Sequence, residues 1–202
     1  PTGTCLILIT PDSERTMCTF LGTAGKINEN DIDINSVKNS EIIFLEGYLW
    51  DEGDPRSAFN KAIQNSRKVA MSLSDLFCVD RHKLNFLDLV KNKLDITFAN
   101  EQEITSLISA KNFDEVITFC QQIRKIIIIT RGEKGSIAVN KNVVVECESQ
   151  KNLKIIDLTG AGDLFAAGYL HGYVNKLTIK ESLEKGTEMS SKIIQKIGAR
   201  LI

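Results

Sequence analysis

The run Asp157–Asp163 places two glycines and an alanine between two carboxylates. It follows the strand-like segment Leu153–Ile156 and precedes the apolar, helix-like stretch Leu164–Val174. A tight glycine turn at the start of a helix leaves backbone N–H groups free, and the helix dipole adds partial positive charge, so this turn suits a phosphate group. Asp163 at the end of the turn should repel that phosphate. Its position makes sense if it takes a proton from a hydroxyl that attacks phosphorus.

A second interpretation of the same run needs no chemistry. Asp157 or Thr159 could cap the following helix, while Gly160 and Gly162 provide a sharp left-handed turn. Spacing alone does not separate the two interpretations, because Gly-x-Gly turns are common.

The segment 130–135, of sequence TRGEKG, directly follows the β-branched run Ile126–Ile129. Such a run is typical of a strand that is buried on both faces. Ligands of open α/β sheets collect at the carboxyl ends of strands, where glycines let a nucleotide approach the backbone. Arg131 or Lys134 could add positive charge near phosphates. A plain turn between two strands, with solvated charges, would have the same composition.

Asn100 and Glu103 also follow a predicted strand, Asp95–Ala99. They are three residues apart and therefore share one face of a helix. One interpretation is an N-cap with its capping-box acid. The other is a magnesium-related role, because Mg²⁺ prefers hard oxygen ligands and keeps several of its waters.

Strands and helices alternate along most of the chain, which predicts an α/β fold with a mostly parallel sheet and helices on both faces. One hairpin is expected, at Ser136–Val139 and Val143–Glu146. Further strands are predicted at Cys5–Thr10, Arg15–Phe20, Glu41–Leu45 and Lys68–Leu73. Helices are predicted at Asp54–Asn65, His82–Lys93, Glu101–Ile108, Phe113–Gln122 and Ile179–Ile197.

The composition is that of an ordinary soluble protein: 202 residues, 43% hydrophobic and 25% charged. This length predicts a single domain over residues 1–202. A net charge of −1 gives no argument for nucleic acid as a partner, and no apolar run is long enough to predict a membrane span. The five cysteines form no C-x-x-C pair, so we expect reduced thiols and a cytoplasmic location.

The run Asp157–Asp163 resembles the C-terminal signature D-T-x-G-A-G-D of the PfkB, or ribokinase-like, family of sugar and nucleoside kinases, with Leu158 in place of the usual Thr. Segment 130–135 resembles the family's T-x-G-x-x-G motif, and Asn100–Glu103 resembles its N-x-x-E motif. The three motifs also occur in the family's order. Further segments resemble the adenosine-kinase-like branch: Arg15–Met17, Glu46–Leu49, Ser74–Asp75 with Arg81–His82, and Gly198–Arg200.

This resemblance implies a ribokinase-like fold and an ATP-dependent kinase that phosphorylates a hydroxyl of a small-molecule sugar or nucleoside. It implies that Asp163 is the catalytic base and that the amides of Gly160, Ala161 and Gly162 form the anion hole. It implies nucleotide contacts at Asn100, Thr130, Arg131, Gly132, Gly135 and Thr187. It also implies Mg²⁺ placement through Glu103, and a K⁺ site near Asp157, Thr159 and Gly198. Thr187 could equally be an ordinary helix residue, and Asp157 an ordinary cap.

The resemblance covers the C-terminal two-thirds of the family fold, with residues 1–25 partly forming strands next to the lid. Most of the lid, the N-terminal strands and the Gly-Gly motif that holds the sugar have no counterpart here. We therefore expect uncovered apolar surface, and with it a homodimer or low stability. The alternative function is a catalytically incompetent nucleotide-binding fragment. A dinucleotide-binding domain is disfavoured because no G-x-G-x-x-G follows the first strand.

Overall fold

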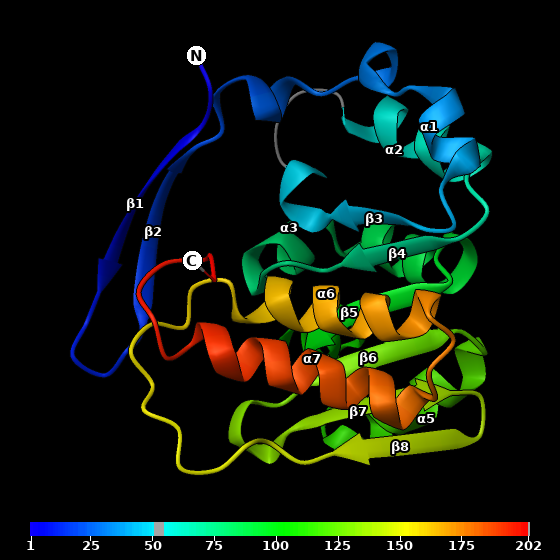
Figure 1. The fold of residues 1–202 in the computed structure, drawn as a ribbon. Coiled ribbons are helices and arrows are strands. Elements are labelled where there is room, and N and C mark those ends of the chain that lie inside the picture. The colour runs from blue at the N-terminus through cyan, green and yellow to red at the C-terminus, as the bar shows by residue number, and fades with distance from the viewer. Residues whose placement is uncertain (51–54, 202) are drawn as a thin grey trace. The chain divides into compact units, whose positions relative to one another are not determined.

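The computed structural model describes residues 1–50 and 55–201 (Figure 1). Its larger sheet is mixed, and β3–β4 and β4–β5 pair in parallel. The strands lie in the order β3 (Ile43–Glu46), β4 (Val69–Ser72), β5 (Ile96–Asn100), β6 (Ile126–Thr130), β7 (Ser136–Asn140) and β8 (Val143–Cys147). A separate antiparallel sheet consists of β1 (Thr4–Ile9) and β2 (Arg15–Phe20). The predicted α/β fold class is confirmed.

Seven α-helices are described, and most of them follow a strand in the sequence. They are α1 (Ile34–Asn39), α2 (Pro55–Asn65), α3 (Leu76–Asp88), α4 (Glu101–Ile108), α5 (Phe113–Ile123), α6 (Ala161–Val174) and α7 (Ile179–Ile193). A π-helical turn at Leu89–Lys93 extends α3, and short 3₁₀ turns include Gly47–Trp50 and Gly132–Lys134. Within these described residues, no helix is both long and apolar enough to cross a bilayer.

The chain clusters into two compact units. The first comprises Pro1–Thr2, Leu21–Ile129 and Val139–Val144, and the second comprises Gly3–Phe20, Thr130–Ala138 and Val145–Ile202. In the first unit the core forms where apolar strands bury their side chains. Its fully buried members include Met71, Phe86, Leu94, Ile96, Ile104, Leu107, Ile127, Ile128 and Ile129. Burial of all three central isoleucines of β6 confirms the interpretation of that run as a strand buried on both faces.

In the second unit, α6 and α7 lie side by side in opposite directions (Figure 1). Glycines permit this close approach. A Cβ on Gly168 would lie 2.5 Å from the Lys185 carbonyl oxygen, and one on Gly186 would lie 2.8 Å from that of Phe165. The two helices therefore pack backbone against backbone, which any side chain at these positions would prevent.

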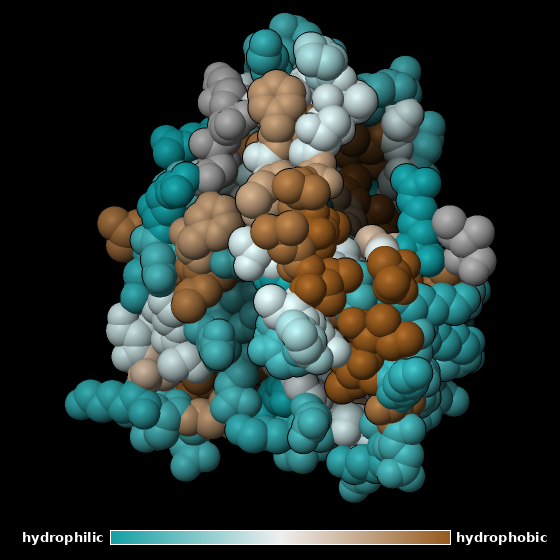
Figure 2. All heavy atoms as spheres, turned by 90° about the vertical axis from the view of Figure 1, so that its left-hand side faces the viewer, coloured by the Kyte–Doolittle hydropathy of each residue, from teal (hydrophilic) through white to brown (hydrophobic). Residues whose placement is uncertain are grey.

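The β1–β2 hairpin, also in the second unit, exposes apolar side chains. Figure 2 faces the side of the hairpin and shows hydrophobic side chains gathered on this surface. Leu6, Met17 and Phe20 are 63%, 46% and 60% exposed. An isolated two-stranded ribbon is marginally stable in water. Exposed apolar side chains on such a ribbon are typical of a surface that contacts another molecule.

Several predicted boundaries were wrong. Leu153–Ile156 is not a strand, because its backbone pairs elsewhere: the Ile156 N–H donates to the Ile194 carbonyl, past the end of α7, at 2.8 Å. Helix α3 begins at Leu76 rather than at His82, because the Asp75 side chain caps it by accepting the Phe77 N–H. The predicted start of α2 at Asp54 lies outside the described residues.

Candidate functional site

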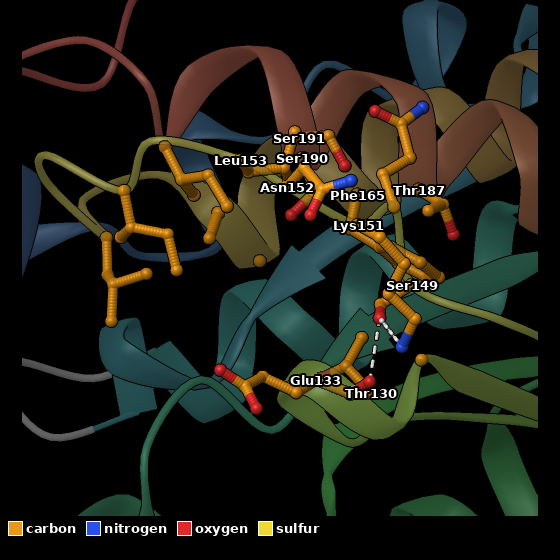
Figure 3. Close-up of a pocket in the computed structure, with 18 of the residues that line it drawn as sticks. Thr130, Glu133, Ser149, Lys151, Asn152, Leu153, Phe165, Thr187, Ser190 and Ser191 are labelled. Atoms are coloured by element: carbon orange, nitrogen blue, oxygen red, sulfur yellow. Dashed lines mark hydrogen bonds between the residues drawn. The ribbon is translucent and has the colours of Figure 1, made fainter.

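A cavity of about 720 Å³ lies within the second unit (Figure 3). Two glycine-containing turns, the start of α6 and one face of α7 contribute to its wall. Residues that the sequence singled out occur in all of these parts: Thr130, Gly132, Gly135, Ala161, Gly162 and Thr187. Folding of the second unit thus brings together segments that are about 30 to 60 residues apart in the chain.

The turn before α6 has the geometry of an anion-binding helix start. Gly160 is the N-cap with a φ of 79°, and a Cβ there would lie 3.1 Å from the Cα of Ala199, so the position requires glycine. The Ala161 N–H donates to the Leu158 carbonyl at 3.2 Å. Among the described residues, no protein acceptor receives the N–H groups of Gly162 or Asp163. These two amides, with the helix dipole, are therefore available to an anion.

Asp163 lies in the first turn of α6 with an exposed side chain. It does not itself line the cavity, although its neighbour Gly162 does. A carboxylate turned into the protein interior would have excluded a proton-accepting role. The exposed position keeps that role open.

The turn at Gly132–Lys134 also depends on glycine geometry. Gly132 and Gly135 have φ values of 56° and 84°, and a Cβ on Gly135 would lie 2.1 Å from the Cys147 carbonyl oxygen. The Arg131 N–H donates to the Gly135 carbonyl at 2.8 Å and closes the turn. Arg131 and Lys134, the cations that the sequence offered for this site, are not among the residues that line the cavity.

Asp157 is fully buried, and its carboxylate fixes the base of the glycine turn. Oδ1 accepts the N–H and the hydroxyl of Thr159 at 2.8 and 2.6 Å, and Oδ2 accepts the Gly198 N–H at 2.8 Å. Burial alone would raise the pKa of Asp157, but the hydrogen bonds from Thr159 and Gly198 outweigh it and hold the pKa below its usual value. The carboxylate thus ties the C-terminal segment to the motif.

Asn100 and Glu103 lie in the first unit and form a reciprocal capping box at the start of α4. The Glu103 carboxylate accepts the Asn100 N–H at 2.9 Å and the Asn100 side-chain amide at 2.7 Å, while the Glu103 N–H donates to Asn100 Oδ1. Burial raises the pKa of Glu103 to about 7, and the carboxylates of Asp75 and Glu46 add to the increase. The capping interpretation is therefore confirmed, and it does not exclude a further role through water.

Other cavity residues were missed by the sequence analysis. Phe165 lies four residues after Ala161 on α6, and Ser190 and Ser191 lie three and four residues after Thr187 on α7, so helical spacing could have found them. Ser149 and Lys151, in contrast, belong to a loop after β8 in which no periodicity marks them. Asp12 and Glu14, in the β1–β2 turn, also line the cavity.

Thr187 combines both interpretations that the sequence left open. It is an ordinary residue of α7, and it also lines the cavity, where its hydroxyl lies 3.6 Å from the Cys147 sulfur.

In the described part of the chain, no group of three or more His, Cys, Asp or Glu residues is arranged to hold a metal ion.

The chain is similar to known kinases in sequence and in structure. The model of the pfkB family of carbohydrate kinases matches residues 1–202. An adenosine kinase of Dictyostelium discoideum is 28% identical over 98% of this chain and 64% of its own length. The crystal structure of adenosine kinase from Sinorhizobium meliloti superimposes with a TM-score of 0.97 at 34% identity, over 100% of this chain and 63% of that one.

A probable sugar kinase from Rhizobium etli has a TM-score of 0.94 at 35% identity, over 99% of this chain and 62% of its own. The chain thus spans somewhat less than two thirds of the length of these relatives.

Proposed function

The chain belongs to the pfkB family of carbohydrate kinases, and from this premise we propose that the protein transfers the γ-phosphoryl group of ATP to a hydroxyl of a sugar or nucleoside. The observation that carries the proposal is the cavity itself. Both the start of α6, through Ala161 and Gly162, and the glycine turn after β6 line it, and the Gly162 amide is available to an anion. Phosphoryl transfer depends mostly on positioning and on electrostatic stabilisation, and this arrangement offers both.

In the proposed reaction, Asp163 accepts the proton of the acceptor hydroxyl. The acceptor oxygen then forms a bond to the γ-phosphorus, the bond from that phosphorus to the β–γ bridging oxygen breaks, and ADP leaves. The amides at the Gly160–Gly162 turn, chiefly that of Gly162, donate to the transferring phosphoryl oxygens. The Ala161 amide contributes less to this proposal than the motif implied, because Leu158 already accepts its hydrogen.

The remaining nucleotide contacts are proposals of the same kind. Thr130, Gly132, Gly135 and Thr187 line the cavity and can contact ATP directly. Asn100 and Arg131 are not cavity-lining residues, so a nucleotide role for either rests on the family motifs alone.

Two cations belong to the proposal. Mg²⁺, when bound, would neutralise phosphate charge. A role for Glu103 in its placement, through a water molecule, rests on the family's N-x-x-E motif alone. K⁺ would sit near Asp157 and Thr159. Asp157 Oδ2 accepts one described hydrogen bond, from Gly198, and an ionised carboxylate oxygen has capacity for a further partner.

The acceptor is a small molecule, and we propose a nucleoside or a sugar because adenosine and sugar kinases are both among the relatives. We also propose that residues 1–202 belong to one kinase domain. The exposed apolar side chains of the β1–β2 hairpin support a further proposal, that two copies of the chain pair through this ribbon, since both of its edges are open to strand addition.

A second candidate function is nucleotide binding without turnover. It concerns residues 1–202 taken by themselves, which span somewhat less than two thirds of the length of these relatives. Groups that position an acceptor can supply about 7–11 kcal/mol of a barrier, so a chain without them could bind ATP and still be inactive. Calorimetric titration with ATP and Mg²⁺, run beside a turnover assay, separates the two functions.

The test of the catalytic role is Asp163→Asn in the complete protein. Loss of a general base lowers turnover by roughly 10²- to 10⁴-fold, and ATP binding should persist because the amide keeps the shape of the side chain. Asp114→Asn is the matched control, since Asp114 is also an exposed acid in the first turn of a helix, α5, away from the motif. Near-normal turnover of the Asp163 variant would refute the assignment.

A further inference from the structure

The cavity has an unbalanced set of charged side chains. Three acidic residues line it, Asp12, Glu14 and Glu133. Of the described residues that line it, Lys151 is the one with a positively charged side chain. A nucleotide triphosphate carries several negative charges, so a cavity that binds it has to offset the repulsion from its own carboxylates.

Lys151 is exposed, and a hydrogen bond within its own loop orients its side chain. Its ammonium group donates to the Ser149 hydroxyl at 3.3 Å, and that hydroxyl donates to the Glu133 carbonyl at 2.7 Å (Figure 3). Glu133 lies in the turn between Gly132 and Gly135. The two hydrogen bonds therefore connect the loop that carries Lys151 to the turn proposed to approach the phosphates.

We propose, on the basis of the proposed function, that Lys151 is the residue that recognises the polyphosphate of the nucleotide and that Ser149 positions it. A lysine ammonium is a compact point charge with three donors on a flexible stem, which suits phosphate oxygens. The long Lys151–Ser149 bond leaves the ammonium free to exchange one protein acceptor for phosphate oxygens, while the shorter Ser149–Glu133 bond keeps the loop in place.

In this proposal the carboxylates of the cavity-lining acids repel the phosphates that Lys151 attracts. The hydrogen bond from the Thr10 side chain, followed by the one from the Glu14 backbone, holds the pKa of Asp12 below its usual value, so Asp12 remains ionised. Glu133 itself provides the backbone carbonyl that anchors Ser149, so its side chain starts from the same turn. Removing the charge of Glu133 should strengthen nucleotide binding, whereas removing that of Lys151 should weaken it.

The experiment measures the dissociation constants of ATP, ADP and AMP by calorimetry in the presence of Mg²⁺. Lys151→Met removes the charge and keeps the apolar stem. Its affinity for ATP should fall roughly 10- to 100-fold, the range expected for one charge-assisted hydrogen bond, with a smaller loss for ADP and the smallest for AMP. Lys151→Arg should retain most of the affinity, and Glu133→Gln should raise it. Lys154→Ala is the control, because Lys154 is exposed and does not line the cavity.

A positioning role for Ser149 predicts a further pattern. Ser149→Ala should weaken ATP binding less than Lys151→Met does, and should have almost no effect when it is added to Lys151→Met. The salt dependence of ATP binding should become less steep in Lys151→Met, because a screened charge pair is lost.

Two results would overturn the inference, and they differ from a failure of the proposed function. ATP binding by Lys151→Met at the wild-type affinity would exclude Lys151 as the phosphate contact. An equal loss for ATP and AMP would show a general effect on the fold. If the unaltered protein binds none of the three nucleotides, the proposed function and this inference both fail.

Discussion

Glu103 provides a quantitative test of how the capping box of α4 responds to pH. The side chain is 5% exposed, and burial raises its pKa from 4.5 to about 7. A carboxyl whose pKa is higher in the folded state than in the unfolded state binds its proton more tightly when folded. Its contribution to stability is therefore complete below pH 4.5 and is lost as the pH rises through about 7.

The magnitude follows from the two pKa values. Each pKa unit corresponds to about 1.36 kcal/mol, so a rise from 4.5 to about 7 corresponds to about 3 kcal/mol of unfolding free energy between pH 4.5 and 8. Glu103→Gln cannot ionise and should lack this decline. It should also lose part of the hydrogen bonding to Asn100, which lowers stability by about 0.5–2 kcal/mol at low pH.

The assay is urea unfolding of the wild-type chain and of the variant at pH 5, 6, 7 and 8. Glu181→Gln is the matched control, because Glu181 forms the same capping box with Thr178 on the exposed start of α7. The hydrogen bond from the Thr178 side chain lowers the pKa of Glu181, so its contribution is present above about pH 4.5 and should not change between pH 5 and 8. Parallel stability profiles for the wild-type and Glu103→Gln chains would refute the reasoning.

The other predictions concern catalysis, binding, packing and assembly. Asp163→Asn should lower turnover and spare ATP binding, and Lys151→Met should weaken binding most for ATP, as described above. Gly168→Ala should lower the free energy of unfolding by about 1–3 kcal/mol in urea titrations, because its Cβ would lie 2.5 Å from the Lys185 carbonyl oxygen. Gly162→Ala, where a Cβ meets nothing within 4 Å, should leave stability unchanged or improve it. In sedimentation velocity the unaltered chain should self-associate. The double variant Leu6→Ser, Phe20→Ser should self-associate less, because both side chains are exposed on the hairpin. If the unaltered chain is a stable monomer, pairing through the hairpin is contradicted.

Local sequence determined most of the secondary structure. Helix α4 begins and ends at the predicted residues, because Asn100 and Glu103 satisfy each other's backbone groups without help from distant parts of the chain. Strand β2 also has its predicted bounds, and β6 forms from an uninterrupted β-branched run. At Leu153–Ile156, where the predicted strand was wrong, a distant partner decided the outcome. Ile156 is as apolar and β-branched as a strand residue, but its N–H donates to Ile194, 38 residues later in the chain.

Some residues of the candidate site could be identified from local sequence, and others only from the tertiary structure. The residue types and spacing of the glycine run identified the turn before α6, because a left-handed Gly160 and free helix-start amides are local properties. Nothing local marked Lys151 or Ser149, whose importance comes from the placement of their loop against the turn of Glu133. Arg131 and Lys134, which the sequence offered either as cations near the phosphates or as solvated surface residues, are not cavity-lining residues. Short-range hydrogen bonds and backbone geometry can be derived from neighbouring residues, but the charges that face a cavity depend on which distant segments the fold brings together.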